Sequence, residues 1–338
     1  YYSILGFLTT AIPRFTETDY LRPKELALFT LQMLGLLIVL LFENAEGPFW
    51  LFLSIGWVLF IWFGSNRFLN RKQNPPFSFI FVAIGVVCGL LGTTCLSLFY
   101  FGLTHSTIVL TLGKISFFDT MTLAFIIGVG SRLIPGILGF QEIVKSQRDI
   151  YEKKEAFLVL VPKLIYLLAI LFITSIVLEV LENFTYAFLL RALIVSYVSF
   201  KYWGIHKKPA KRTWHSFFIF VAAYLILLAS WLLVFLEETI AIKHLLYIGS
   251  YTLLTFMIAS RVILAHSSSG LDLEKRFNPY AILGILFVAA AATRATANYF
   301  PEIYISHLGY AGLTLFIALS FWGFIFIPKI FGVFRRQS

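Results

Sequence analysis

Long apolar runs, separated by short stretches that hold most of the charge, are the feature that most restricts how this chain can fold. A helix needs about 20 consecutive apolar residues to cross a bilayer, and eleven runs are compatible with such spans, the first of them cut short. They cover residues 1–13, 26–43, 47–65, 77–103, 115–139, 155–178, 183–200, 214–236, 241–266, 279–300 and 306–328. Because lipid offers the backbone no hydrogen-bond partners, these runs predict helices. The expected fold class is therefore all-α, a polytopic transmembrane helical bundle.

The composition agrees with this expectation. Hydrophobic residues make up 59% of the 338 residues and charged residues 13%, whereas soluble domains have about 45–50% and about 25%. A soluble enzyme, a secreted disulfide scaffold and a disordered chain are thereby excluded. No linker interrupts the pattern, so residues 1–338 are expected to form a single membrane-embedded helical domain. Since Tyr1 already lies inside an apolar run, we expect a further N-terminal span, with 11 spans visible and 12 in the full chain.

The charges indicate how the spans are oriented. The net charge is +10, and most cations lie in alternate loops and in the C-terminal tail, whereas the other loops carry mainly glutamates. Arg67, Arg71 and Lys72 are counted here as one of these basic loops. Loops rich in lysine and arginine face the cytoplasm. The pattern therefore predicts a cytoplasmic C-terminus.

Apart from Lys243, which begins a run and is counted with the loops, five cations fall inside the apolar runs, where a charge costs at least ~2.5–3.5 kcal/mol. Lys163 and Arg294 lie near enough to span ends for their side chains to snorkel to the interface, whereas Arg191 lies in mid-span. Arg132 and Arg261 lie in the cytoplasmic halves of two spans, where snorkelling and ligand binding are both open. Buried arginines suit carboxylates and phosphates because the planar guanidinium makes paired hydrogen bonds, and haem propionates are carboxylates.

The histidines fall at span ends or in loops. Three of them are expected at the outer face, namely His105, His244 and His307. Neutral imidazole is a common metal ligand, and haem iron takes an axial histidine, so these three are candidate metal ligands. A solvated histidine at the interface is the alternative for each. The other three are expected towards the cytoplasm: His206, His215 and His266.

Motifs of soluble enzymes are missing from the sequence: it has no HExxH, CxxC, P-loop or nucleophile-elbow pattern. The two cysteines, Cys88 and Cys95, lie seven apart in one apolar run, which is too far for a relaxed disulfide on a helix. We expect both to be buried thiols. Gly128 and Gly130 lack the strand–turn–helix context of a dinucleotide site, and small residues there favour close helix packing.

Three stretches together resemble the NnrS family, multi-span bacterial membrane proteins associated with haem, copper and nitric-oxide stress. Residues 6–13 (GFLTTAIP) are similar to the family's "GFLLTAVP" segment, and residues 128–135 (GVGSRLIP) to its "GVGGRLIP" segment. The third stretch begins with His244 at a span start and ends with Arg261 and His266 five apart, similar to "TRVSLGH". Trp322 near the last span also fits, so the resemblance covers nearly the whole chain.

The resemblance implies a bacterial inner-membrane protein with an outer-leaflet haem or copper site, to which His244 contributes. The family's "WHAHEM"-like histidine pair would lie before Tyr1. Arg261 and His266 match the motif but lie towards the cytoplasm. Two interpretations are open for them: a second cofactor site, or contacts that hold the helices together. Together with Arg132 they are the candidate cofactor-binding residues. His105 and His307 match no family motif and are candidates by depth alone.

Three functions are compared on this basis. The first is a haem-containing protein, with copper as a further metal, that binds or processes nitric oxide; its partners would be the bilayer and nitric oxide, not nucleic acid. Turnover, carriage, sensing and metal handling would all leave the same sequence. The second is a transporter of a small anion or a metal-related solute that uses the intramembrane arginines. The third, a haem–copper oxidase-like reductase, ranks last because it needs several intramembrane histidines.

Overall fold

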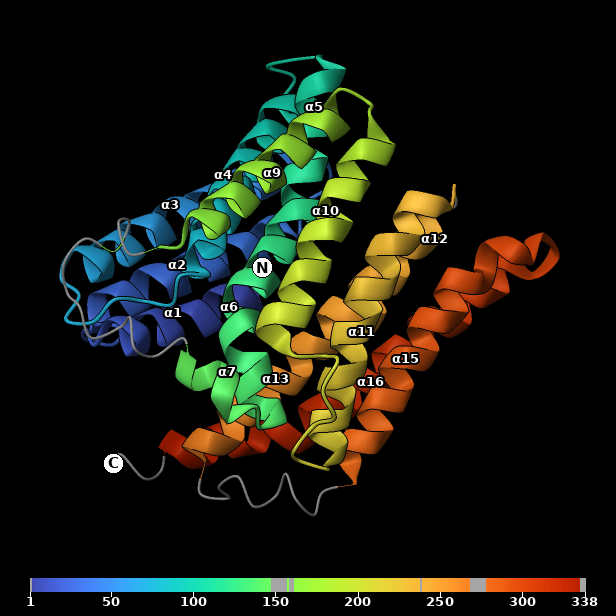
Figure 1. Cartoon of the computed structure of the whole chain (residues 1–338). Coiled ribbons are helices and arrows are strands. Elements are labelled where there is room, and N and C mark those ends of the chain that lie inside the picture. Colours follow the sequence, from blue (N-terminus) through green and yellow to red (C-terminus); the bar gives the residue numbers. More distant parts are fainter. Residues whose placement is uncertain (1, 147–156, 158–160, 238, 268–277, 335–338) are drawn as a thin grey trace. The chain divides into compact units, whose positions relative to one another are not determined.

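In the computed structural model, residues 2–146, 157, 161–237, 239–267 and 278–334 are described, and all regular structure among them is helical (Figure 1). The chain divides into two compact units. Unit 1 comprises Tyr1–Arg132 and Val144–Leu190, and unit 2 comprises Leu133–Ile143 and Arg191–Ser338. One helix is divided between the units at Arg132 and another at Leu190.

Nine helical segments in the described part of the chain are long and apolar enough to cross a membrane. They are Glu46–Leu69, Phe79–Tyr100, Thr107–Leu138, Lys163–Val180, Phe184–Trp203, Trp214–Phe235, Thr239–Ala265, Pro279–Tyr299 and Pro301–Lys329. The first two helices, α1 (Tyr2–Thr16) and α2 (Pro23–Val39), have 15 and 17 residues and fall below that length. The all-helical, multi-pass prediction is thus confirmed, while a count of 11 or 12 spans stays a prediction.

Unit 1 contains α1, α2, α3 (Glu46–Leu69), α4 (Phe79–Tyr100) and α9 (Lys163–Val180). It also contains α5 (Thr107–Lys114), the π-helix η1 (Ile115–Thr120) and α6 (Met121–Leu138) as far as Arg132. Helix α4 packs on α3 and on the α5–η1 segment. Glycines permit this packing: a Cβ on Gly92 would lie 2.7 Å from the backbone nitrogen of Phe117. The span that contains these segments, Thr107–Leu138, begins eight residues before its predicted start at residue 115.

Gly128 shows the same close approach farther along α6. A Cβ there would lie 2.9 Å from the backbone nitrogen of Val82, and the hydroxyl of Ser78 donates a hydrogen bond to the Gly128 carbonyl. The interpretation of Gly128 as a packing residue is confirmed.

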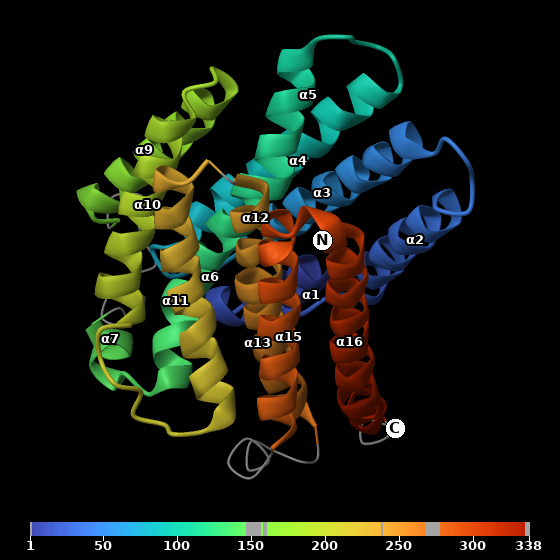
Figure 2. The same ribbon diagram turned by 90° about the vertical axis from the view of Figure 1, so that its right-hand side faces the viewer.

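Unit 2 contains most of α10 (Phe184–Val198) together with η2 (Ser199–Trp203) and α11 (Trp214–Phe235). These are followed by α12 (Thr239–His244), η3 (Leu245–Thr252), α13 (Leu253–His266), α15 (Pro279–Thr296) and α16 (Tyr304–Phe334). Figure 2 shows α13, α15 and α16 side by side, and α15 also contacts α11, α12 and η3. The core of the unit combines small, aliphatic and aromatic residues, among them Ala222, Ile226, Leu253 and Phe287.

Two spans each contain a π-helix near their start, which begins one residue after Lys114 in the first span and two residues after Lys243 in the second. In the first, α5 leads into η1 and α6; in the second, α12 leads into η3 and α13. A π-turn shifts the hydrogen-bond pattern of a helix, and such turns often mark functional sites. In each span a threonine hydroxyl donates to the carbonyl five residues earlier: Thr120 to Ile115 at 3.1 Å, and Thr252 to Tyr247 at 2.8 Å.

The sequences of the two spans match at the same positions. Lys114 precedes Ser131 by 17 residues, and Lys243 precedes Ser260 by 17 residues. Both serines are buried, and each donates to the carbonyl four residues earlier. The two spans therefore share local structure as well as the spacing of their lysine and serine. The residue after the lysine differs between the two spans: Ile115 and His244.

Candidate functional site

His244 is the last residue of α12, directly before the π-helix η3. Its ring atom Nδ1 lies 2.7 Å from the carbonyl oxygen of Ile240. A carbonyl can only accept a hydrogen bond, so Nδ1 carries a proton, and in the neutral imidazole Nε2 is then the atom with the lone pair. This is the state in which histidines bind metals, with the other nitrogen held by a backbone carbonyl. The ring of Tyr247 lies 6.5 Å away, centre to centre.

His307 lies in the first turn of α16, and its ring centre is 5.3 Å from that of Phe300. The side chain is half-buried, and its Nδ1 atom is shielded from solvent. Within the described residues this atom has no hydrogen-bond partner. A buried polar atom without a partner is uncommon in a folded protein and calls for an explanation.

Arg294, in the last turn of α15, has the same property. Its Nη1 atom is shielded from solvent and has no hydrogen-bond partner in the part of the chain that the structure describes. The sequence assigned Arg294 to snorkelling, and it was missed as a site residue. The signal that would have found it is spacing: Arg294 continues the row formed by Tyr280, Phe287 and Ala291, all of them buried.

These three residues belong to the same end of unit 2. A Cβ on Gly249 in η3 would lie 3.0 Å from the Cβ of Ala291 in α15. Because the two segments run in opposite directions, His244 is then level with the last turn of α15, which holds Arg294. The contact between Phe300 and His307 places the start of α16 at this end as well. We call His244, Arg294 and His307 the His244 cluster.

The remaining predicted residues lie elsewhere. His105 is exposed in the loop between α4 and α5 of unit 1. Arg132 is half-buried in α6, and its Nη1 donates to the carbonyl of Val144 at 3.0 Å. This bond ties α6 to α7 (Gln141–Ser146), which is a structural use of the side chain. In the described ranges no three histidine, cysteine or acidic side chains gather as they would around a metal ion.

Arg261 and His266 lie in α13, at the opposite end of unit 2 from His244. The side chain of His266 is outside the described residues. Near this end, His215 is 1% exposed, and its Nε2 donates to the carbonyl of Met257 at 2.9 Å. Its ring lies 4.9 Å from that of Tyr280. The sequence placed His215 beside a basic loop, whereas the structure makes it a core residue that links α11 to α13.

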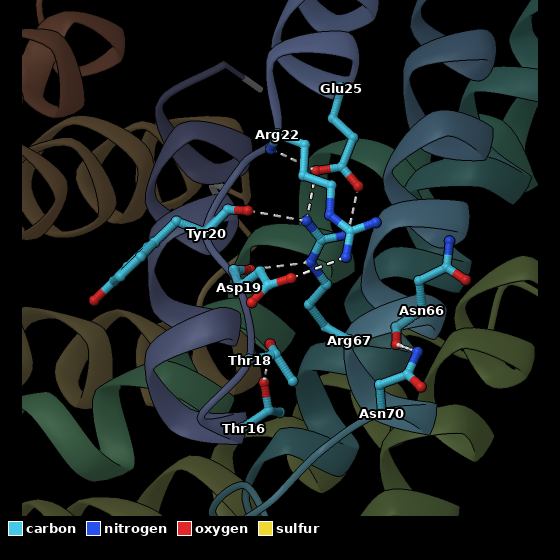
Figure 3. A network of polar contacts seen from close by, with 9 residues as sticks. All are labelled: Thr16, Thr18, Asp19, Tyr20, Arg22, Glu25, Asn66, Arg67 and Asn70. Atoms are coloured by element: carbon cyan, nitrogen blue, oxygen red, sulfur yellow. Dashed lines mark hydrogen bonds and ion pairs between the residues drawn. The ribbon is translucent and has the colours of Figure 1, made fainter.

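The most extensive polar network in the described residues surrounds Arg67 (Figure 3). Both terminal nitrogens of Arg67 donate to the carboxylate of Glu25. Nε donates to the carbonyl of Asp19 at 3.3 Å and Nη2 to that of Tyr20 at 3.1 Å. The guanidinium also lies 4.2 Å from the ring centre of Phe63. All three guanidinium nitrogens are thus used within the protein, and the network is a structural clamp.

Arg67 also corrects the sequence analysis, which counted it with the loop cations. It lies inside α3 and is 4% exposed. Glu25 lies at the start of α2, before the apolar run 26–43, and accepts a further bond from the backbone nitrogen of Arg22 at 2.8 Å. The hydrogen bond from Arg67 holds the pKa of Glu25 below its ordinary value. In the exposed loop, the hydrogen bond from Arg22 likewise lowers the pKa of Asp19.

Comparison with known proteins gives one result. A family model described as "NnrS protein" matches residues 2–333 of the chain. Neither the curated proteins nor the solved structures contain a match. The match extends over all eleven apolar runs and includes every member of the His244 cluster. The chain is therefore a multi-pass membrane protein that belongs to the NnrS family.

Proposed function

We propose that this protein is a haem-containing inner-membrane protein of the nitric oxide response or metabolism, and that His244 is a ligand of the haem iron. Membership of the NnrS family supports the association with nitric oxide. The observation that carries the proposal is the hydrogen bond from Nδ1 of His244 to Ile240, which leaves Nε2 as the lone-pair nitrogen.

The residues of the His244 cluster fit a haem by their chemistry. His244 provides an oriented imidazole, and Arg294 provides a shielded guanidinium nitrogen without a protein partner. A haem iron binds an imidazole nitrogen, and the haem propionates pair with a guanidinium. When bound, a haem iron would supply a centre that binds nitric oxide. Nitric oxide is small, neutral and lipid-soluble, so it can reach such a centre through the bilayer without an aqueous pore.

Copper is proposed as a second metal in addition to the haem iron. Imidazole suits copper, and His244 and His307 lie at one end of unit 2. These two histidines are fewer than the three protein ligands of a blue-copper site. Copper binding would therefore require further ligands in addition to this pair.

An absorption spectrum of the full-length protein purified in detergent, oxidised and then reduced with dithionite, tests the proposal. We expect a Soret band with haem near one per chain, and we expect His244→Ala to lose most of the band. His206→Ala is the matched control, since His206 is exposed in a loop of the same unit. The two variants should show similar unfolding midpoints. Equal haem content and identical spectra in His244→Ala and wild type would contradict the ligand assignment.

A second candidate function is transport of a small anion, and the unpartnered Nη1 of Arg294 favours it. Buried cations in membrane spans commonly mark substrate pathways. A transporter would be colourless and would move a labelled anion into proteoliposomes. A colourless full-length protein with measurable nitrite flux would replace the haem proposal with this one.

A further inference from the structure

Arg294 lies on the packed face of α15. The buried residues Tyr280, Leu283, Phe287 and Ala291 recur every three or four residues along this face, and Arg294 follows Ala291 by three. A helix presents residues at this spacing to its neighbours. A snorkelling arginine would lie on the lipid-facing side, so the position of Arg294 indicates a role inside unit 2.

His307 lies on the packed face of α16 in the same way. The buried residues of this helix are Ala311, Ala318 and Phe326, and His307 precedes Ala311 by four residues. Its shielded Nδ1 atom and the shielded Nη1 of Arg294 both lack a hydrogen-bond partner in the described parts of the chain. Two such atoms on facing helices indicate a shared ligand.

The contacts between α15 and α16 give the register of the two residues. The helices run antiparallel, with the ring centres of Tyr280 and Phe326 5.9 Å apart and those of Phe300 and His307 5.3 Å apart. Arg294 lies in the last turn of α15, and Phe300 follows it by six residues, just beyond the 3₁₀ turn Ala297–Tyr299. Arg294 and His307 therefore lie at the same end of the α15–α16 pair, next to the connection between the two helices.

We propose that Arg294 and His307 bind the carboxylate-like end of an anion. A guanidinium presents its donors in a planar fork that matches two oxygens of a carboxylate. His307 adds a ring nitrogen from the first turn of α16, where the helix dipole favours negative charge. Lys243 contributes another positive charge at this end, while Glu237 and Glu302 are exposed.

This assignment separates the roles of the two histidines. A guanidinium that shares an anion with His307 would disfavour a metal cation on the same ring, because like charges repel. His307 is therefore assigned to the anion, and His244 remains the single proposed iron ligand of the cluster. The anion has two possible sources, which are a propionate of a bound haem and a free small oxyanion. In the first case the inference rests on the proposed function; in the second it does not.

The first arm of the test compares haem with haem dimethyl ester, whose propionates carry no charge. Both are titrated into haem-depleted full-length protein and followed by the Soret band. If a propionate is the ligand, the wild type should bind haem about tenfold more tightly than the ester, as expected for one charge-assisted contact. R294Q should reduce this ratio to about one, and R212Q, which removes an exposed cation of the same unit, should leave it unchanged.

The second arm needs no haem. Thermal unfolding of the haem-depleted protein is measured in sodium nitrite, sodium formate and sodium chloride at equal ionic strength. If a free oxyanion is the ligand, nitrite or formate should raise the Tm of the wild type saturably and chloride should not. R294Q should lose this rise, while R212Q should keep it.

A difference between wild type and R294Q in either arm supports the site and names the source of the anion. Identical behaviour of the two proteins in both arms would overturn the proposal. If R294Q does not fold, R294K takes its place, because lysine keeps the charge and lacks the planar fork, and it should bind about tenfold more weakly. Failure of the haem proposal is distinguishable, since H244A would then keep the wild-type spectrum whatever happens at Arg294.

Discussion

The indole Nε1 of Trp322 donates a hydrogen bond to the hydroxyl of Ser260 at 2.8 Å, although 62 residues separate the two in sequence. Ser260 in turn donates to the carbonyl of Phe256 at 2.7 Å, and the rings of Phe256 and Trp322 meet edge to face at 4.9 Å. The last helix is thereby attached to α13, next to Arg261. The motif that contains Ser260 and Arg261 thus has a structural role at this position.

Ser260→Ala should destabilise the protein by about 1–2 kcal/mol, because it leaves the indole N–H without its acceptor. The measurements are denaturant unfolding in detergent and the fluorescence emission maximum of Trp322, recorded in a protein in which Trp322 is the only tryptophan. Thr174→Ala is the control, since the Thr174 hydroxyl is exposed and donates only to Ile170 in its own helix. Equal losses in both variants would refute a special role for the Trp322 contact.

Glu25→Gln should cost roughly 3–5 kcal/mol of stability, because it leaves the buried charge of Arg67 uncompensated. Both side chains of this pair are 5% exposed. Asp19→Asn is the control: the pair of Asp19 and Arg22 is exposed, and its loss should leave the unfolding transition unchanged. An E25Q protein as stable as the wild type would show that the clamp does not contribute.

The same carboxylate makes stability depend on acid. The hydrogen bond from Arg67 lowers the pKa of Glu25 in the folded state below its ordinary value of 4.5. The contribution of the carboxylate is fully present above the ordinary value and is lost as the pH falls through the lowered folded pKa. Unfolding midpoints measured at a series of pH values below 4.5 should therefore fall more steeply for the wild type than for E25Q. Parallel curves would contradict the assignment.

Gly128→Ala should destabilise the protein by about 1–3 kcal/mol, the usual cost of overpacking. The new Cβ would lie 2.9 Å from the nitrogen of Val82 and 3.1 Å from the carbonyl oxygen of Ser78, and backbone atoms cannot move away as a flexible side chain can. Gly312→Ala is the matched control, because its Cβ would meet nothing within 4 Å. We expect Gly312→Ala to be neutral or slightly stabilising, and thermal unfolding of both variants decides the point.

The helical spans were predictable from the sequence because lipid exposure leaves a simple signature. An apolar run marks a span whatever its neighbours are, and predicted ends such as 214–236 agree with α11 within a residue. The start of the span at Thr107 was missed because polar residues such as Lys114 interrupt the apolar signal. Arg67 was misplaced for a related reason, since a cation near a span end looks the same whether it faces water or a buried carboxylate.

The site was harder to predict from the sequence than the spans were, because it depends on which helices face one another. His244 was found through its motif, whereas Arg294 differs from a snorkelling arginine only in its spacing from residues such as Ala291, and that spacing is informative only once the packed face of α15 is known. Its role follows from the faces of α15 and α16 that meet, which is a property of packing. His215 shows the same limit, since its partner Met257 lies 42 residues farther along the chain.

The similar spans through η1 and η3 have a consequence for what His244 contributes to the fold. Both spans contain a π-helix and a buried serine 17 residues after a lysine, so this local structure forms with or without a histidine after the lysine. Ile115 keeps the first span apolar at the place where the second span carries His244. The helical structure of such a span thus does not depend on the histidine, which leaves the His244 side chain available for chemistry.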